Sequence, residues 1–177
     1  MSIITERLEL IPANEQLLRA AQQGDATLAE ALGVRLAPAW PPEFYEETSL
    51  AWTLDQLAKG PEQAGWLMYF FVVRDGRMLI GYGGYKGAPT GDGTVEVGYS
   101  VVDDHQRRGY ATEATRGLVV RAFSYPQVSR VVAETMPDRI PSIGVLEKIG
   151  FTFIGAGAEE GVIRYELPRL VSPPDES

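Results

Sequence analysis

The chain has 177 residues, 45% of which are hydrophobic, and a formal net charge of −8 at pH 7. This length predicts one domain with a core of its own. The absence of cysteine excludes disulfides, thiol catalysis and cysteine-ligated metals. A single histidine, His105, argues against a Ser-His-Asp triad and a multi-histidine zinc site, so we expect no metal. A chain this acidic is a poor general binder of nucleic acid.

The sequence shows neither a signal peptide nor a membrane-spanning segment. Residues 1–6 lack the basic and then apolar pattern of a signal peptide, and no apolar run approaches the ~20 residues needed to cross a bilayer. We therefore expect a soluble, cytoplasmic protein with no membrane partner. We expect a single domain over residues 1–170 and a flexible C-terminal tail over residues 171–177.

Apolar periodicity and turn residues predict the elements of the first half of the chain. These are a strand over residues 7–12, two short helices between residues 14 and 32 that divide at Gly24-Asp25, and a helix over residues 48–59. Residues 33–49 hold three prolines around Trp40, which predicts a loop with an exposed aromatic residue. We interpret Trp40 as a candidate wall of a substrate pocket, whereas Trp66 and Tyr69 are expected in the core.

The second half is predicted to alternate between strands and helices, and Asp75-Gly76 is a strong hairpin signal. The predicted elements are strands over residues 66–73, 77–85, 95–102 and 128–135, helices over residues 111–123 and 141–149, and a final hairpin over residues 151–154 and 162–167. This order is not a repeated strand-helix pattern. It predicts an α+β fold, with a mixed, mostly antiparallel central sheet flanked by helices.

The segment Gln106-Arg107-Arg108-Gly109-Tyr110-Ala111 joins a predicted strand to a predicted helix. The first amides of a helix lack internal partners and carry partial positive charge. Because Gly109 has no Cβ, phosphate oxygens can approach the backbone there. Residues 105–139 also hold six arginines against three acids, which suits a compact polyanion. On spacing alone, the alternative is a solvated loop with two arginines.

Three segments together resemble the GNAT superfamily of N-acetyltransferases. The first is Glu96-Val97-Gly98-Tyr99-Ser100 followed by residues 106–114, which is similar to the family's acyl-CoA-binding core. The second is residues 142–151, which resemble its second motif. The third is Thr5-Glu6-Arg7-Leu8-Glu9-Leu10, which resembles the Rim-type branch that acetylates the N-termini of ribosomal proteins.

The resemblance implies acetyl-CoA as cosubstrate, a primary amine as acceptor and, as an open possibility, a homodimer. The residues that it assigns to CoA binding are Val101, Gln106, Arg107, Arg108, Gly109, Tyr110, Ala111, Thr112, Arg139 and Ser142. The family often has Asn where this chain has Arg139, so the pantetheine contact is in question, and Arg139 could instead reach a phosphate of CoA. The family also has a tyrosine that acts as general acid near the start of the helix predicted over residues 141–149, and this chain lacks it there.

Glu96 and Ser142 are the candidate catalytic residues. Glu96 is predicted to share a strand face with Gly98 and Ser100, opposite Tyr99, where it could serve as base or bind the acceptor. The resemblance implies that Ser142 hands a proton to the leaving sulfur, as a relay or a hydrogen-bond donor. The alternatives are a solvent-facing acid at Glu96 and a helix-capping role for Ser142. Gly98 suggests a β-bulge that frees its amide for the thioester carbonyl.

The predicted function is therefore acetyl-CoA-dependent N-acetylation of a protein N-terminus or a small-molecule amine, by direct attack in a ternary complex. The alternative is a non-catalytic acyl-CoA sensor or interaction domain. The sensor would keep the phosphate site and lose the chemistry.

Overall fold

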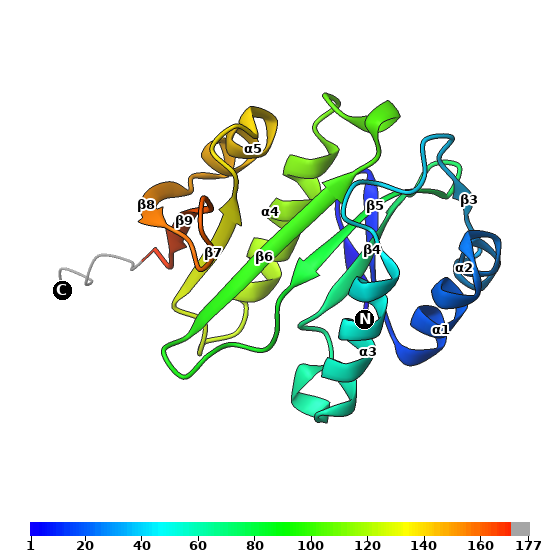
Figure 1. The fold of residues 1–177 in the computed structure, drawn as a ribbon, viewed down its shortest axis with the longest axis horizontal. Helices are drawn as coiled ribbons and strands as arrows, with labels where there is room; N and C mark the ends of the chain where they lie inside the picture. Colours follow the sequence, from blue (N-terminus) through cyan, green and yellow to red (C-terminus); the bar gives the residue numbers. More distant parts are fainter. Residues whose placement is uncertain (171–177) are drawn as a thin grey trace, which may run out of the picture.

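The computed structural model describes residues 1–170, and the predicted tail over residues 171–177 lies outside the described residues. Within residues 1–170, nine strands form one mixed sheet, in the order β1-β2-β4-β5-β6-β7-β9-β8, with β3 paired to β5 (Figure 1). The strands are β1 (Ile3–Ile4), β2 (Leu8–Pro12), β3 (Arg35–Leu36), β4 (Met68–Val73), β5 (Met78–Tyr85), β6 (Thr94–Val101), β7 (Arg130–Thr135), β8 (Thr152–Ala156) and β9 (Ile163–Pro168). Most pairs are antiparallel, and β3–β5 and β6–β7 are parallel.

Helices cover both faces of the sheet (Figure 1). They are α1 (Glu15–Gln23), α2 (Asp25–Leu32), α3 (Glu47–Ala58), α4 (Tyr110–Phe123) and α5 (Ile140–Ile149), with short 3-10 turns over Pro61–Gln63 and Asp103–His105. The predicted α+β fold class is confirmed. The short strands β1 and β3 were not predicted, because two residues carry too little periodicity to be recognised.

Strand β4 explains how the two faces are divided. Tyr69 and Phe71 point into the core under α4, while Met68, Phe70 and Val72 point into a second core under α1, α2 and α3. All five side chains are buried because both faces of β4 are covered. A strand covered on both faces reads as a continuous apolar run, which is the pattern seen in the sequence. Trp66 and Tyr69 are core residues, as predicted.

Strand β6 occupies the middle of the sheet, and α4 follows it directly along the chain. Val95 and Val97 pack on the α4 side with Leu118 and Ala122, so Glu96 between them turns to the opposite face. Residues 102–109 carry the chain from the end of β6 to the start of α4. Among residues 1–170, we find no helix whose length and apolar character suit a membrane crossing.

Candidate functional site

The sheet opens between β6 and β7. Their parallel pairing runs from Thr94 with Arg130 to Val97 with Ala133 and ends there among the described residues, although β6 continues to Val101. Figure 1 shows β7 turning away from β6 beyond this point. The second half of β6 keeps its partner β5 on one side only, so its other side borders a gap between two central strands.

The main-chain groups that face this gap belong to Tyr99 and Val101. The amide of Lys86 donates to Glu96 O at 3.0 Å, and the amide of Val102 donates to Ile80 O at 2.8 Å, so residues 96 and 102 turn toward β5. Because alternate residues of a strand direct their main-chain groups to opposite sides, Gly98 also turns toward β5.

The predicted bulge at Gly98 is therefore wrong. The β5–β6 register is continuous from Val97 to Val101, and the Gly98 amide faces β5 and not the gap. The amide that faces the gap is instead that of Tyr99, one residue later. Strand separation after Val97, without any extra residue, exposes it.

The turn after β6 concentrates free amides. Arg107 and Gly109 both adopt left-handed backbone conformations, with φ of 61° and 80°, and Gly109 is the N-cap of α4 without any side-chain cap. Among residues 1–170, the amides of Tyr110, Ala111 and Thr112 have no hydrogen-bond partner. Left-handed residues next to a helix start produce a concave set of N–H groups that suits an anion.

Gln106 fixes this turn to the strand. Its Nε2 donates to Val101 O at 3.0 Å and to Asp103 Oδ1 at 3.2 Å. One of the two main-chain carbonyls facing the gap is thus occupied by a side chain of the turn. Gln106 therefore links the turn to the strand, and its contact with CoA stays a prediction.

On the α4 side of β6, Tyr99 and Ser142 meet. Tyr99 Oη donates to Ser142 O at 3.0 Å and lies 3.2 Å from Ser142 Oγ. Burial raises the pKa of Tyr99 to about 12, although the Ser142 contact lowers it, so the phenol keeps its proton at neutral pH. Ser142 makes no capping hydrogen bond, since α5 begins after Arg139 without a side-chain cap. The helix-capping alternative for Ser142 is therefore wrong.

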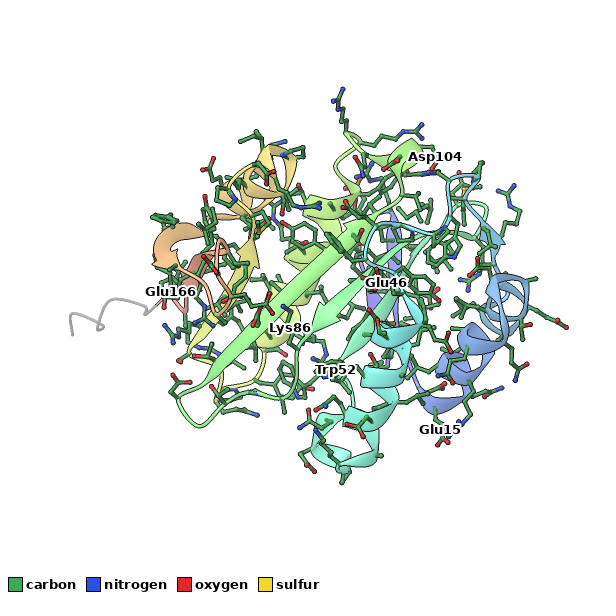
Figure 2. The ribbon with its side chains drawn as sticks, viewed as in Figure 1. Glu15, Glu46, Trp52, Lys86, Asp104 and Glu166 are labelled. Carbon is green, nitrogen blue, oxygen red and sulfur yellow. The ribbon has the colours of Figure 1, made fainter. Side chains whose placement is uncertain are left out.

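Glu96 lies on the other face of β6. Its Oε1 is 2.8 Å from Nζ of Lys86, which is labelled beside β6 in Figure 2, and 21% of its side chain is exposed. It turns away from the α4 side, where Tyr99 and Ser142 lie. A ligand that enters the gap after Val97 lies between the two faces of the sheet. The Glu96 carboxylate is on one face, and the hydroxyls of Tyr99 and Ser142 are on the other.

Arg139 contacts an acidic loop. Its guanidinium forms a two-point ion pair with Glu43, at 2.9 Å and 2.5 Å, and lies 4.6 Å from the centre of the Phe44 ring. The hydrogen bond from Arg139 lowers the pKa of Glu43. In this structure Arg139 thus joins the start of α5 to the loop before α3, and its charge is already paired.

Trp40 is less exposed than its proline-rich surroundings predict. It packs between the two cores, and its ring lies 5.0 Å from that of Tyr45, which lies 5.4 Å from that of Tyr82. Burial raises the pKa of Tyr82 to about 12, and nearby Glu46 adds to the rise. Tyr82 pairs with Ser100 across β5 and β6, so this aromatic cluster lies beside the gap on the Glu96 face.

Arg7 and Glu113 both lie in motifs of the sequence, but neither is predicted to have a role of its own. In the structure they bind each other, with Arg7 Nε 2.7 Å from Glu113 Oε2, and Arg7 Nη1 donates to Arg108 O at 2.9 Å. The sequence does contain both partners, Thr-x-Arg near the N-terminus and Thr-Glu in the first turn of α4. Nothing in the sequence pairs them, however, and the contact is seen only in the folded chain.

An open mixed sheet, with a gap in its middle and an amide-rich turn at the end of the gap, is the arrangement expected of an acyl-CoA-dependent transferase. Residues 8–152 match the family described as "Acetyltransferase (GNAT) domain". The chain belongs to this family and is an acetyltransferase.

Relatives and solved structures agree with this assignment. The uncharacterized N-acetyltransferase YjdG of Bacillus subtilis (strain 168) is 31% identical over 156 residues, covering 88% of this chain and 92% of YjdG. The ribosomal L7/L12 α-N-protein acetyltransferase RimL, solved with CoA, superposes with a TM-score of 0.67 at 17% identity, over 95% of this chain and 98% of RimL. The ribosomal-protein-S5-alanine acetyltransferase of Vibrio fischeri gives 0.64 at 18% identity, over 95% and 96% of the two chains. At these identities, the structural matches establish the shared fold alone.

Within residues 1–170, no three histidine, aspartate or glutamate side chains come together in a way that could hold a metal ion.

Proposed function

We propose that the chain transfers an acetyl group from acetyl-CoA to a primary amine by direct attack within a ternary complex. The observation that carries the proposal is the arrangement along one strand, β6. Its second half borders the gap, its end leads into the amide-rich turn, and its two faces carry Glu96 on one side and the Tyr99–Ser142 pair on the other.

The turn and the gap offer one site for the two ends of CoA. The diphosphate is expected on the amides of residues 108–112, with the charges of Arg107 and Arg108 beside it. The pantetheine arm is expected in the gap, where the main-chain groups of Tyr99 and the Val101 amide are open to it. Since Arg139 is bound to Glu43, we assign it no phosphate contact.

The reaction forms one C–N bond and breaks one C–S bond. The neutral amine attacks the thioester carbonyl, the Tyr99 amide stabilises the developing oxyanion, and the tetrahedral intermediate expels the CoA thiolate. The amine proton passes to Glu96, directly or through water. The Ser142 hydroxyl, which is held by Tyr99, hydrogen-bonds the leaving thiolate and relays to it a proton taken up from solvent. An α-amino group titrates near 8 and a lysine near 10.4, so a modest base suffices for an N-terminus.

The acceptor side is acidic and aromatic. Glu43, Glu46 and Glu47 follow Pro41 and Pro42, and Tyr45 between them packs against Trp40 and Tyr82. Such a surface suits a cationic amine, and a protein N-terminus, a polyamine, an aminoglycoside and an amino acid remain the candidate classes.

Two measurements test the proposal. Isothermal titration with CoA should show binding, and absence of binding at millimolar CoA would end the hypothesis. A thiol-release assay with acetyl-CoA should then show turnover with at least one amine class.

The role of Glu96 has its own test. Glu96→Gln should lower kcat and remove the acid limb of the pH profile while CoA affinity holds, because the amide cannot accept a proton. An unchanged profile would remove Glu96 from the mechanism.

A further inference from the structure

The segment Thr5-Glu6-Arg7 lies against the first turn of α4, more than 100 residues away along the chain. Glu113 is the centre of this contact. It accepts hydrogen bonds from Thr5 Oγ1 at 2.6 Å, from the amide of Arg7 at 2.6 Å and from Arg7 Nε at 2.7 Å. Three donors on one largely buried carboxylate hold the segment firmly against the helix.

The guanidinium of Arg7 then extends from Glu113 to the turn itself. Nη1 donates to Arg108 O at 2.9 Å, and the guanidinium carbon lies 4.2 Å from the centre of the Tyr110 ring. Nη2 lies beside Gly109, only 3.4 Å from where a Cβ would be. One side chain therefore touches Arg108, Gly109 and Tyr110, three consecutive residues of the turn.

These contacts fix the direction of the turn's peptide groups. When Arg7 holds the carbonyl of Arg108, the peptide between Arg108 and Gly109 cannot rotate freely, because its carbonyl and its amide point in opposite directions. The amide of Gly109 and those that follow keep one orientation. A preorganised set of donors binds an anion more tightly than a set that must reorder on binding.

A cavity of about 400 Å³ is lined by Arg7 and Gly109 of this contact and by the neighbouring Thr112. Its walls include three cations, Arg7, Arg116 and Lys148, and two acids, Glu6 and Glu113. Since Glu113 is already satisfied by Arg7 and Thr5, the remaining charge in this cavity is positive.

We infer that Arg7 is a positioning residue for the diphosphate of CoA, acting through the carbonyl of Arg108. The inference rests on the proposed function, since it assumes that the turn binds CoA. A structural alternative is that Arg7 only anchors the N-terminal segment to α4. The two readings differ in what happens to a substrate that lacks the diphosphate.

The test compares acetyl-CoA with acetyl-pantetheine, which carries the same thioester without the nucleotide diphosphate. In Arg7→Gln we expect KM for acetyl-CoA to rise about 10-fold, the size of one lost hydrogen bond to a charged group. For acetyl-pantetheine we expect kcat/KM to stay within about 2-fold of the wild type. The KM of Arg7→Lys for acetyl-CoA should lie between those of the wild type and Arg7→Gln, because an ammonium keeps the charge but cannot reach Glu113 and Arg108 together.

Arg74→Gln is the matched control. Arg74 donates to the carbonyls of Thr5 and Glu6 at 3.1 Å and 3.2 Å, so it braces the same segment without touching the turn. Arg74→Gln should leave KM for acetyl-CoA and kcat/KM for acetyl-pantetheine at their wild-type values.

The outcomes separate the two hypotheses. Equal losses with both thioesters in both Arg7 variants, or an unchanged KM for acetyl-CoA, would overturn the role of Arg7. A thermal melt of each variant shows whether folding is intact, and if Arg7→Gln does not fold, Arg7→Lys decides. A wild type that binds no CoA would instead overturn the proposed function.

Discussion

Two regions at the open edge of the sheet are built differently. The turn over residues 107–110, the donor end of the proposed site, offers main-chain amides and is braced by Glu113, whose side chain is 15% exposed. The loop over residues 37–46, the acceptor end of the proposed site, meets α5 through Glu43 and Arg139, and the Glu43 side chain is 60% exposed. The first end depends on backbone geometry and largely buried charge, whereas the second depends on side chains at the surface.

This difference shows which part of the site is fixed and which is adjustable. A turn that presents amides tolerates few substitutions, because its conformation is its function. A loop held by an exposed ion pair gains little from that pair, so its side chains can change without losing the fold. We therefore expect donor binding to depend on the turn and acceptor choice to depend on the loop.

The largest effect is expected at Gly109. In Gly109→Val the left-handed backbone becomes unfavourable, and the turn should lose at least two amide contacts to the diphosphate, which weakens CoA binding by about 100-fold. Isothermal titration measures the change. Gly91→Val is the control, because Gly91 lies in a loop with open space around it. Near wild-type affinity in Gly109→Val would contradict the assignment of the turn.

Tyr99→Phe tests the middle of the gap. The ring still packs, but Ser142 loses its hydroxyl partner, and we expect kcat to fall about 10-fold while KM for acetyl-CoA changes little. Steady-state kinetics across pH measure both constants. Tyr125→Phe removes a hydroxyl that contacts only Arg121 among the described side chains and should change neither. An unaltered kcat in Tyr99→Phe would show that Ser142 does not need this partner.

Glu113 should make the donor end sensitive to acid. Burial raises the pKa of Glu113, but the hydrogen bonds from Thr5 and Arg7 outweigh burial and bring it below its ordinary value. Because its pKa is lowered, Glu113 stabilises the fold at pH values above the ordinary glutamate pKa of about 4.3. This stability is lost as the pH falls through the folded-state pKa.

Glu113→Gln should therefore lower the free energy of unfolding by about 1 kcal/mol at pH 7 and by less below pH 4. Urea unfolding at a series of pH values measures it. Glu147→Gln changes an exposed acid of α5 and should show no such trend. A loss in Glu113→Gln that does not vary with pH would contradict the account.

The smallest effect is expected at the acceptor end. Glu43→Gln breaks an exposed ion pair and should change KM for acetyl-CoA by less than 2-fold, while KM for a cationic amine rises by about 2- to 3-fold. Asp55→Asn breaks another exposed ion pair, with Lys59 at the end of α3, and as the control should change neither KM. A larger effect on acetyl-CoA than on the amine would reverse the proposed division of the site.

Local pattern was enough to predict most elements. The division of α1 from α2 at Gly24, the turn at Asp75-Gly76 and the start of α5 around Pro141 were all visible, because glycine and proline restrict the backbone at the residue itself. The turn at Gly109 was predicted from the same property of glycine, but its left-handed conformation was not. The pairing of Tyr99 with Ser142 was not visible, since 43 residues separate them and nothing in either motif specifies the other.

The sequence by itself determined the order of the longer strands and helices, the amide-rich turn and the family, since each depends on residues close together in the chain. Only the tertiary structure decided that β6 and β7 separate after Val97, that the Tyr99 amide rather than that of Gly98 faces the gap, and that Arg7 binds the turn. Those features depend on which segments become neighbours once the sheet is assembled, and contacts across 40 to 100 residues leave no local periodicity to read.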